Sequence, residues 1–260
     1  MEKLIKYELK GIYKEIVILI GIIVIGNLLI LTRHNVWPDQ VIATFSLLLW
    51  FGTSIAVFIW NIAIFGRDLY GDTGYLLFSL PVKGYKIVAA KLITSFIQLA
   101  VINIVAIIFI YINVMSAQGA PQAISFLKEN INPGFIALSL VGSIFEYIYI
   151  LIMVYFSISI SKVAIKNRKL GAFGTFVVFI VISLVTGKIT DLLVDLFPQT
   201  LNVNILSPAG MLNVGNTSIN SVNLSASPAS FPISIIVFSV LMFIVFFGAS
   251  SYLIENKIDM

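Results

Sequence analysis

Few side chains in this 260-residue chain could carry acid–base, nucleophilic or metal chemistry. The chain has one histidine, His34, and no cysteine, so thiol catalysis and cysteine-ligated metals are excluded. Gly187 and Lys188 are followed by Ile189 where a phosphate-binding loop would need Ser or Thr. A lone loop histidine is usually a solvated residue. We therefore expect a protein that is not an enzyme, with no catalytic residue, no metal site and no bound cofactor.

One acid, Glu146, stands near the centre of a long apolar run. A charge in mid-bilayer costs at least about 3 kcal/mol, so we expect this side chain to face the interior of a helix bundle. Small and polar residues lie on the same predicted helix face as Glu146, and similar residues share one face in two other apolar runs. They predict either packing between helices or a pathway for substrate or protons. The candidate pathway residues are Thr53, Asn61, Ser143, Glu146, Tyr149, Thr175 and Ser183.

The amino-acid composition predicts the membrane-spanning helices that position these residues. Apolar residues make up 59% of the chain and charged residues 11%, against about 25% charged in soluble domains. An ordinary soluble protein and a disordered one are excluded. The continuous apolar runs predict helices and not β-barrel strands. We expect an all-α polytopic membrane protein, with residues 1–260 forming a single transmembrane domain. Its predicted spans are 16–32, 41–65, 92–115, 135–160, 171–186 and 233–253.

The basic residues predict the orientation. With the N-terminus inside, thirteen of the sixteen Lys and Arg residues fall on the inner side and three on the outer side. This asymmetry predicts that the N- and C-termini lie in the cytoplasm. We expect the protein to be a multi-pass protein of the plasma membrane of a bacterial cell. The basic residues are spread over four separate inner segments, which favours contact with anionic lipid over nucleic-acid binding.

Each of three segments outside the predicted spans has more than one possible structural interpretation. Residues 2–14 are amphipathic and predict an interfacial helix or a plain extension of the first span. Residues 75–80 predict a short, uncharged apolar helix on the cytoplasmic side, ended by Pro81. This helix either lies in the lipid interface or under the bundle, or docks into a partner protein. Residues 190–197 predict a short amphipathic helix in the outer stretch between spans five and six, which is either a linker-like loop or a re-entrant segment.

A resemblance adds to this interpretation. The stretch Arg-Asp-Leu-Tyr-Gly-Asp-Thr-Gly-Tyr-Leu-Leu-Phe-Ser-Leu-Pro-Val-Lys at residues 67–83, followed by Lys91, resembles a signature between spans two and three of type-2 ATP-binding-cassette (ABC) exporter permeases. The Tyr-Glu-Leu-Lys opening at residues 7–10 also looks like that family. The resemblance covers essentially the whole chain.

The resemblance implies a role and a partner for each part of the chain. Residues 2–14 would be the connecting helix, and residues 75–80 the coupling helix that fits a groove on a separate P-loop ATPase subunit, present in two copies. ATP and Mg²⁺ would bind that partner. Spans two and five would line a path between this chain and a second permease copy or a homologous permease. The work implied is ATP-driven export of an amphiphile such as a peptide, drug or lipid. The implied ATPase contacts are Asp72, Gly74, Tyr75, Leu76, Leu77, Phe78, Leu80, Pro81 and Lys83.

Two other classes remain open. A secondary transporter or channel would be driven without an ATPase, although the chain lacks the series of intramembrane charges that ion-coupled pumps often have. A peptide-sensing or immunity subunit would bind its ligand without moving it.

Overall fold

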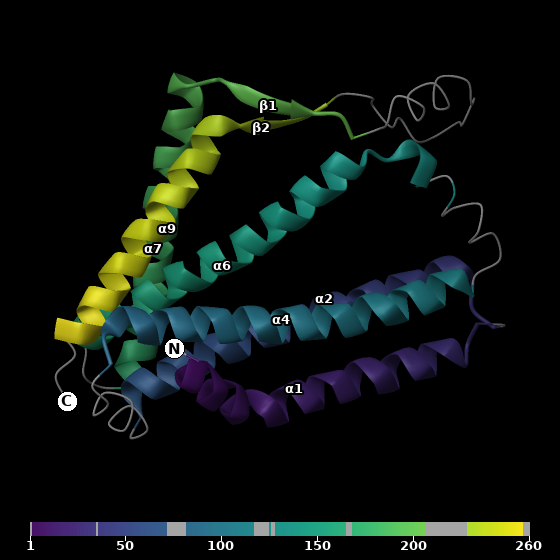
Figure 1. The fold of residues 1–260 in the computed structure, drawn as a ribbon, viewed down its shortest axis with the longest axis horizontal. Helices are drawn as coiled ribbons and strands as arrows, with labels where there is room; N and C mark the ends of the chain where they lie inside the picture. Colours follow the sequence, from purple (N-terminus) through teal and green to yellow (C-terminus); the bar gives the residue numbers. More distant parts are fainter. Residues whose placement is uncertain are drawn as a thin grey trace. The chain divides into compact units, whose positions relative to one another are not determined.

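A computed structural model describes residues 2–34, 36–71, 82–116, 125, 128–164, 168–205 and 228–256. Within these ranges six helices are long and apolar enough to cross a membrane. The protein is therefore a mostly helical, multi-span membrane protein. The helices are α1 (Glu2–Leu31), α2 (Asp39–Tyr70), α4 (Gly84–Met115), α6 (Pro133–Ala164), α7 (Arg168–Leu196) and α9 (Ile233–Asn256) (Figure 1).

The described chain forms two compact units. The first contains residues 1–118, 150–182 and 243–260, and the second contains residues 119–149 and 183–242. Three of the helices, α6, α7 and α9, contribute one part to each unit.

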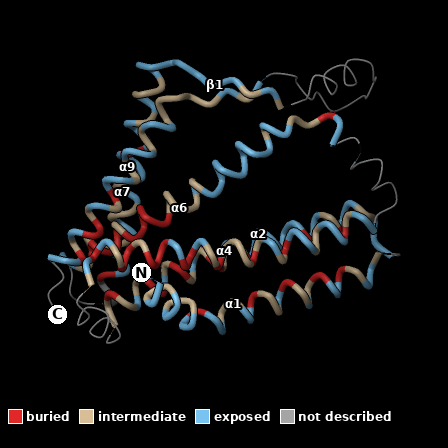
Figure 2. The backbone as a smooth tube through the Cα atoms, viewed as in Figure 1, coloured by how far each residue is buried: buried red, intermediate tan, exposed pale blue. Residues whose placement is uncertain are grey.

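The core of the first unit is a three-helix bundle of α1, α2 and α4, each of which packs against the other two. Leu19, Ile23, Val57 and Ile102 meet at its centre, and all four are buried. Figure 2 shows buried positions recurring along each of these helices, with exposed ones between them. This alternation is typical of a helix that presents one stripe to its neighbours and the other face to lipid.

Polar layers join the same three helices. Asn113 Nδ2 donates to Asn27 Oδ1 at 2.8 Å and to Ser46 Oγ at 2.7 Å, and all three residues are buried. Elsewhere in the bundle Asn61 Nδ2 donates to Gln98 Oε1 at 2.9 Å. Hydrogen bonds between membrane helices contribute only about 0.6 kcal/mol each on average, so these layers fix which residues face one another more than they add stability.

The second unit contains the only strands in the described part of the chain. β1 (Thr200–Val203) pairs with β2 (Ala229–Pro232) as an antiparallel ribbon, with Leu201 opposite Phe231. The ribbon follows α7 and precedes α9, so it joins these two helices at one end. The expectation of an all-α chain is wrong in this detail.

Two predicted helix boundaries need correction. Residues 2–14 continue into the first span without a break, so the alternative of an extended span describes α1 better than a separate helix. Residues 190–196 continue α7 in the same way, where a re-entrant segment was expected. Both stretches are amphipathic, and their own backbone hydrogen bonds let the helix continue beyond the apolar run.

Candidate functional site

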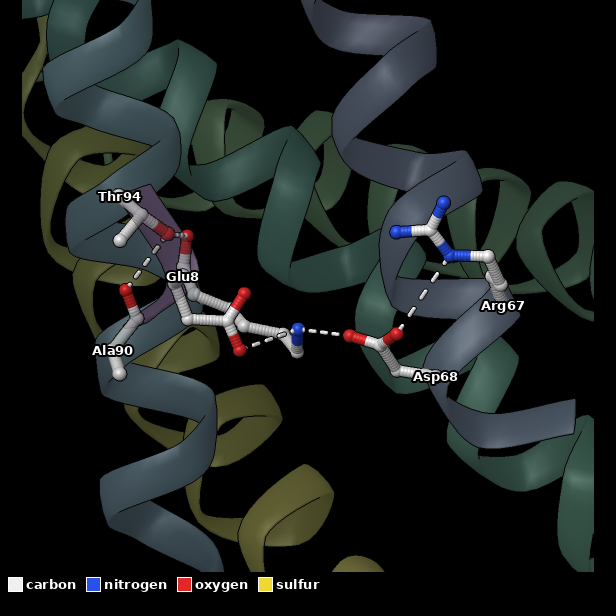
Figure 3. A network of polar contacts seen from close by, with 6 residues as sticks. Glu8, Arg67, Asp68, Ala90 and Thr94 are labelled. Atoms are coloured by element: carbon white, nitrogen blue, oxygen red, sulfur yellow. Dashed lines mark hydrogen bonds and ion pairs between the residues drawn. The ribbon is translucent and has the colours of Figure 1, made fainter. Parts of the chain in front are cut away.

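An ion cluster joins three helices of the first unit at one end of the bundle. We call it the Lys91 cluster, formed by Glu8 of α1, Arg67 and Asp68 of α2, and Lys91 of α4. Lys91 Nζ lies 2.9 Å from Glu8 Oε1 and also forms an ion pair with Asp68 Oδ2 (Figure 3). Arg67 Nε lies 3.9 Å from the other oxygen of Asp68. The four formal charges cancel.

The ion pairs of the Lys91 cluster are largely buried, which raises the energetic cost of losing a partner. The Lys91 side chain is 3% exposed, and those of Glu8 and Asp68 are 15% and 16% exposed. A lysine is almost never so buried unless it is paired, because the unpaired ammonium would lose its hydration without compensation. The two carboxylates come from residues far apart in the sequence, so the pairing fixes α1 and α2 onto the beginning of α4.

Each of these residues could be named from the sequence, but their pairing could not be predicted from it. Glu8, Asp68 and Lys91 fall in the stretches quoted for the resemblance, but none was expected to pair. The available signal was the position of Lys91 directly before an apolar run. A charge at such a boundary predicts a nearby counter-charge.

Two of these helices flank the segment expected to contact an ATPase: α2 ends before it and α4 begins after it. Residues 72–81 lie outside the described residues, so Asp72, Gly74, Tyr75, Leu76, Leu77, Phe78, Leu80 and Pro81 have no described position. Lys83 is described and is exposed just before α4.

On the α2 side of this segment, Tyr70 is held by the ends of two other helices. Its hydroxyl donates to Ser161 Oγ at 3.2 Å, and Ser161 Oγ donates to the Gly171 carbonyl at 2.7 Å. Lys162 Nζ lies 4.8 Å from the centre of the Tyr70 ring. A Cβ on Gly171 would come within 2.5 Å of that ring, so glycine allows the close approach of α7 to α2.

On the α4 side, Gly84 is held against the end of α9. Its backbone N–H donates to Glu255 Oε2 at 3.1 Å. A Cβ at this position would overlap the backbone carbonyl oxygen of Ser251. Glycine is therefore needed here, and the N-terminus of α4 is fixed to α9 by a hydrogen bond to a charged acceptor.

A cavity of about 310 Å³ lies beside Tyr70, between α2, α6 and α7. Its walls are mainly apolar, and its polar lining comes from Arg67, Tyr70 and Thr175. Thr175 Oγ1 donates to the Gly171 carbonyl at 2.9 Å, so this predicted pathway residue lies at the cavity wall. The cavity suits an apolar group with a polar or anionic end.

The other predicted pathway residues are not brought together. Thr53 and Asn61 are buried inside the bundle, and Thr53 Oγ1 bonds to carbonyls of its own helix at 2.9 Å. Ser183 is exposed on α7. Asn61 joins α2 to α4 through Gln98, whereas the hydrogen bonds of Thr53 go to Leu49 and Trp50 of its own helix.

The expected interior position of Glu146 is also not found. Glu146 and Ser143 are exposed on α6, and Tyr149 is partly buried, whereas Met153 and Ser157 further along the same stripe are buried. Periodicity in the sequence shows which residues share a face but not how far along the helix a neighbour covers it.

No protein-family model matches the chain, and searches of curated proteins and of solved structures also return no match.

Proposed function

We propose that this multi-span membrane protein is the transmembrane subunit of an ATP-driven ABC exporter. In this proposal it forms a path together with a second permease, and a separate P-loop ATPase contacts it through the loop at residues 71–83. The N- and C-termini lie in the cytoplasm of a bacterial cell. The observation that carries the proposal is the Lys91 cluster at the base of this segment.

The Lys91 cluster would pass movement of the contact segment on to the spans. A subunit without its own phosphate-binding loop needs a rigid connection between the ATPase contact and the spans. Residues 72–81 leave from the end of α2 and return just before α4. Asp68 is paired with Lys91, which also holds Glu8, and Gly84 is bonded to Glu255. A displacement of the segment would therefore be passed to four helices at once and not absorbed at a hinge.

The cavity beside Tyr70 supports the class of substrate. It has apolar walls with Arg67 and Tyr70 at its polar part, and it lies between spans two and five, with span four as its third wall. These are the two spans expected to line the path. We propose that it receives the apolar part of an amphiphile such as a peptide, drug or lipid during entry.

The distribution of basic residues supports the orientation. Lys162 and the Lys91 cluster lie at helix ends that the excess of Lys and Arg assigns to the cytoplasm. An ATPase that uses cytoplasmic ATP would meet the segment on this side.

The first test is purification of the tagged chain in mild detergent from its own cell. We expect a P-loop ATPase to copurify in equal amount, and export of a fluorescent amphiphile from vesicles to require ATP. Transport driven by an ion gradient, with no ATPase present, would instead establish a secondary transporter. Ligand binding with no transport would establish a sensing or immunity subunit.

A pair of variants tests the contact segment. Phe78→Asp places a charge on the segment expected to dock, and should abolish both ATPase copurification and export. Phe78→Leu keeps an apolar side chain and serves as the matched control, with both properties retained. Normal ATPase binding by Phe78→Asp, at normal membrane abundance, would contradict the assignment of residues 71–83 as the ATPase contact.

A further inference from the structure

The first turns of α1 carry an exposed stripe of lysine and tyrosine side chains. At about 3.6 residues per turn these side chains fall within an arc of about 120° on the helix surface, opposite to the buried Ile12. Tyr7 is 75% exposed and Tyr13 is 62% exposed, and the lysines between them and beside them are also exposed. We call this face the α1 stripe, and its members are Lys3, Lys6, Tyr7, Lys10, Tyr13 and Lys14.

The positive charge of the α1 stripe is not neutralised by the described part of the protein. None of its four lysines forms an ion pair with a described residue. Glu8 lies on the other side of the helix, where it is paired with Lys91. Glu2 is exposed at the edge of the stripe, and four lysines less this one acid leave a net charge of +3. A partner that covers the stripe therefore has to be anionic.

The α1 stripe lies where the helix leaves the hydrocarbon core of the membrane. α1 has 30 residues, which span about 45 Å, whereas the hydrocarbon core is about 30 Å thick. The apolar run begins at residue 16, so the part of α1 that lies outside the hydrocarbon is its beginning. Figure 1 shows the first turns of α1 inclined to the rest of the helix. A segment inclined in this way runs along the membrane surface, which places the stripe at the level of the lipid headgroups.

We propose that the α1 stripe binds the phosphate groups of anionic phospholipids in the adjoining leaflet. A lysine near an anionic lipid surface gains about 1 kcal/mol, or roughly fivefold in affinity. Tyrosine rings, which are apolar with a polar tip, are enriched at the level of the headgroups, so Tyr7 and Tyr13 favour a lipid surface over a soluble acidic partner. No member of the stripe belongs to the Lys91 cluster or to the loop at residues 71–83, so a negative result here leaves the proposed function untouched.

A fluorescent reporter beside the α1 stripe tests the proposal in nanodiscs. The chain has no cysteine, and a Cβ on Gly11 meets nothing within 4 Å, so Gly11→Cys accepts a bimane label next to Lys10. The nanodiscs contain equal amounts of phosphatidylglycerol and phosphatidylcholine, and a nitroxide high on an acyl chain of one or the other lipid quenches the label at short range.

We expect phosphatidylglycerol to be enriched about fivefold over phosphatidylcholine beside the reporter at low salt. The preference should fall to about one in 1 M salt, where the Debye length is about 3 Å. A preference that survives 1 M salt would overturn the electrostatic contact. Equal quenching by the two lipids at low salt would overturn the proposal and leave a soluble acidic partner as the match for the stripe.

Three double variants of the labelled protein locate the contact. Lys10→Gln with Lys14→Gln removes the two charges nearest to the reporter, and should lower the preference to less than about twofold. Lys128→Gln with Lys188→Gln removes the same charge from exposed positions outside the stripe, and should leave the preference unchanged. Lys10→Arg with Lys14→Arg keeps the charge and should keep the preference. Equal losses in the two glutamine pairs, or a loss in the arginine pair, would refute a charge contact at the α1 stripe.

Discussion

Replacing Lys91 with methionine tests the Lys91 cluster most directly. Methionine keeps most of the side-chain volume and removes the charge. The variant leaves the carboxylates of Glu8 and Asp68 without the ammonium that both now contact. Arg67 lies 3.9 Å from Asp68 with a side chain that is 53% exposed, so it compensates little.

The expected loss follows from burial. Removing one member of a buried ion pair costs about 3–5 kcal/mol, because the remaining charge stays desolvated. Glu8 and Asp68 are 15% and 16% exposed and keep some contact with water, so we expect the lower end of that range. A loss of about 3 kcal/mol corresponds to roughly a 160-fold shift of the unfolding equilibrium, at about 1.36 kcal/mol for each factor of ten.

The assay is reversible unfolding of the purified protein in mixed micelles. Lys83→Met removes the same charge from an exposed position close by on the sequence, and should change the free energy of unfolding by less than about 0.5 kcal/mol. The triple variant Glu8→Gln, Asp68→Asn and Lys91→Met removes the three buried charges of the cluster. It should recover most of the loss, because the one ion left, Arg67, is 53% exposed and stays solvated. A Lys91→Met protein as stable as Lys83→Met, or a triple variant whose loss is the sum of the single losses, would refute this reasoning.

Three further predictions concern other contacts. Gly84→Ala should destabilise the protein by about 1–3 kcal/mol, since the new methyl group overlaps a carbonyl of α9. The control is Gly142→Ala, where a Cβ meets nothing within 4 Å; this variant should be neutral or slightly stabilising in the same unfolding assay. Asn113→Leu removes two interhelical hydrogen bonds and should lower the free energy of unfolding by about 1 kcal/mol, and a value near zero would mean that the polar layer contributes nothing. In the cysteine-free chain, a cysteine at Lys188 should react with an impermeant maleimide from outside intact cells and a cysteine at Lys166 only after lysis; the reverse pattern would invert the orientation.

The number and kind of spans could be predicted from the sequence. Each apolar run corresponds to one helix of the structure, because a backbone in lipid must satisfy its hydrogen bonds within its own segment. That constraint is local, so composition alone identifies the spans. Helix ends are less well determined: α7 continues to Leu196, ten residues beyond the predicted end at residue 186, because hydrogen bonding within the helix continues past the apolar run.

The candidate site was only partly predictable. The sequence identified Lys91, Asp68 and the Tyr-Glu-Leu-Lys stretch as separate features, and it singled out Glu146 as a lone acid. Their surroundings differ in ways that periodicity does not reveal, since Lys91 is buried between two carboxylates while Glu146 is exposed.

By itself, the sequence determined that this is a multi-span membrane protein with six segments long and apolar enough to cross a membrane, because transfer of apolar residues into lipid depends on each segment alone. Only the tertiary structure decided which polar groups meet. Glu8 and Lys91 are 83 residues apart, and their contact depends on how α1 lies against α4. The same holds for Gly84 and Glu255, which are 171 residues apart and meet because α4 begins against the end of α9. Packing between segments selects these partners, and packing is a property of surfaces that the linear order of residues does not specify.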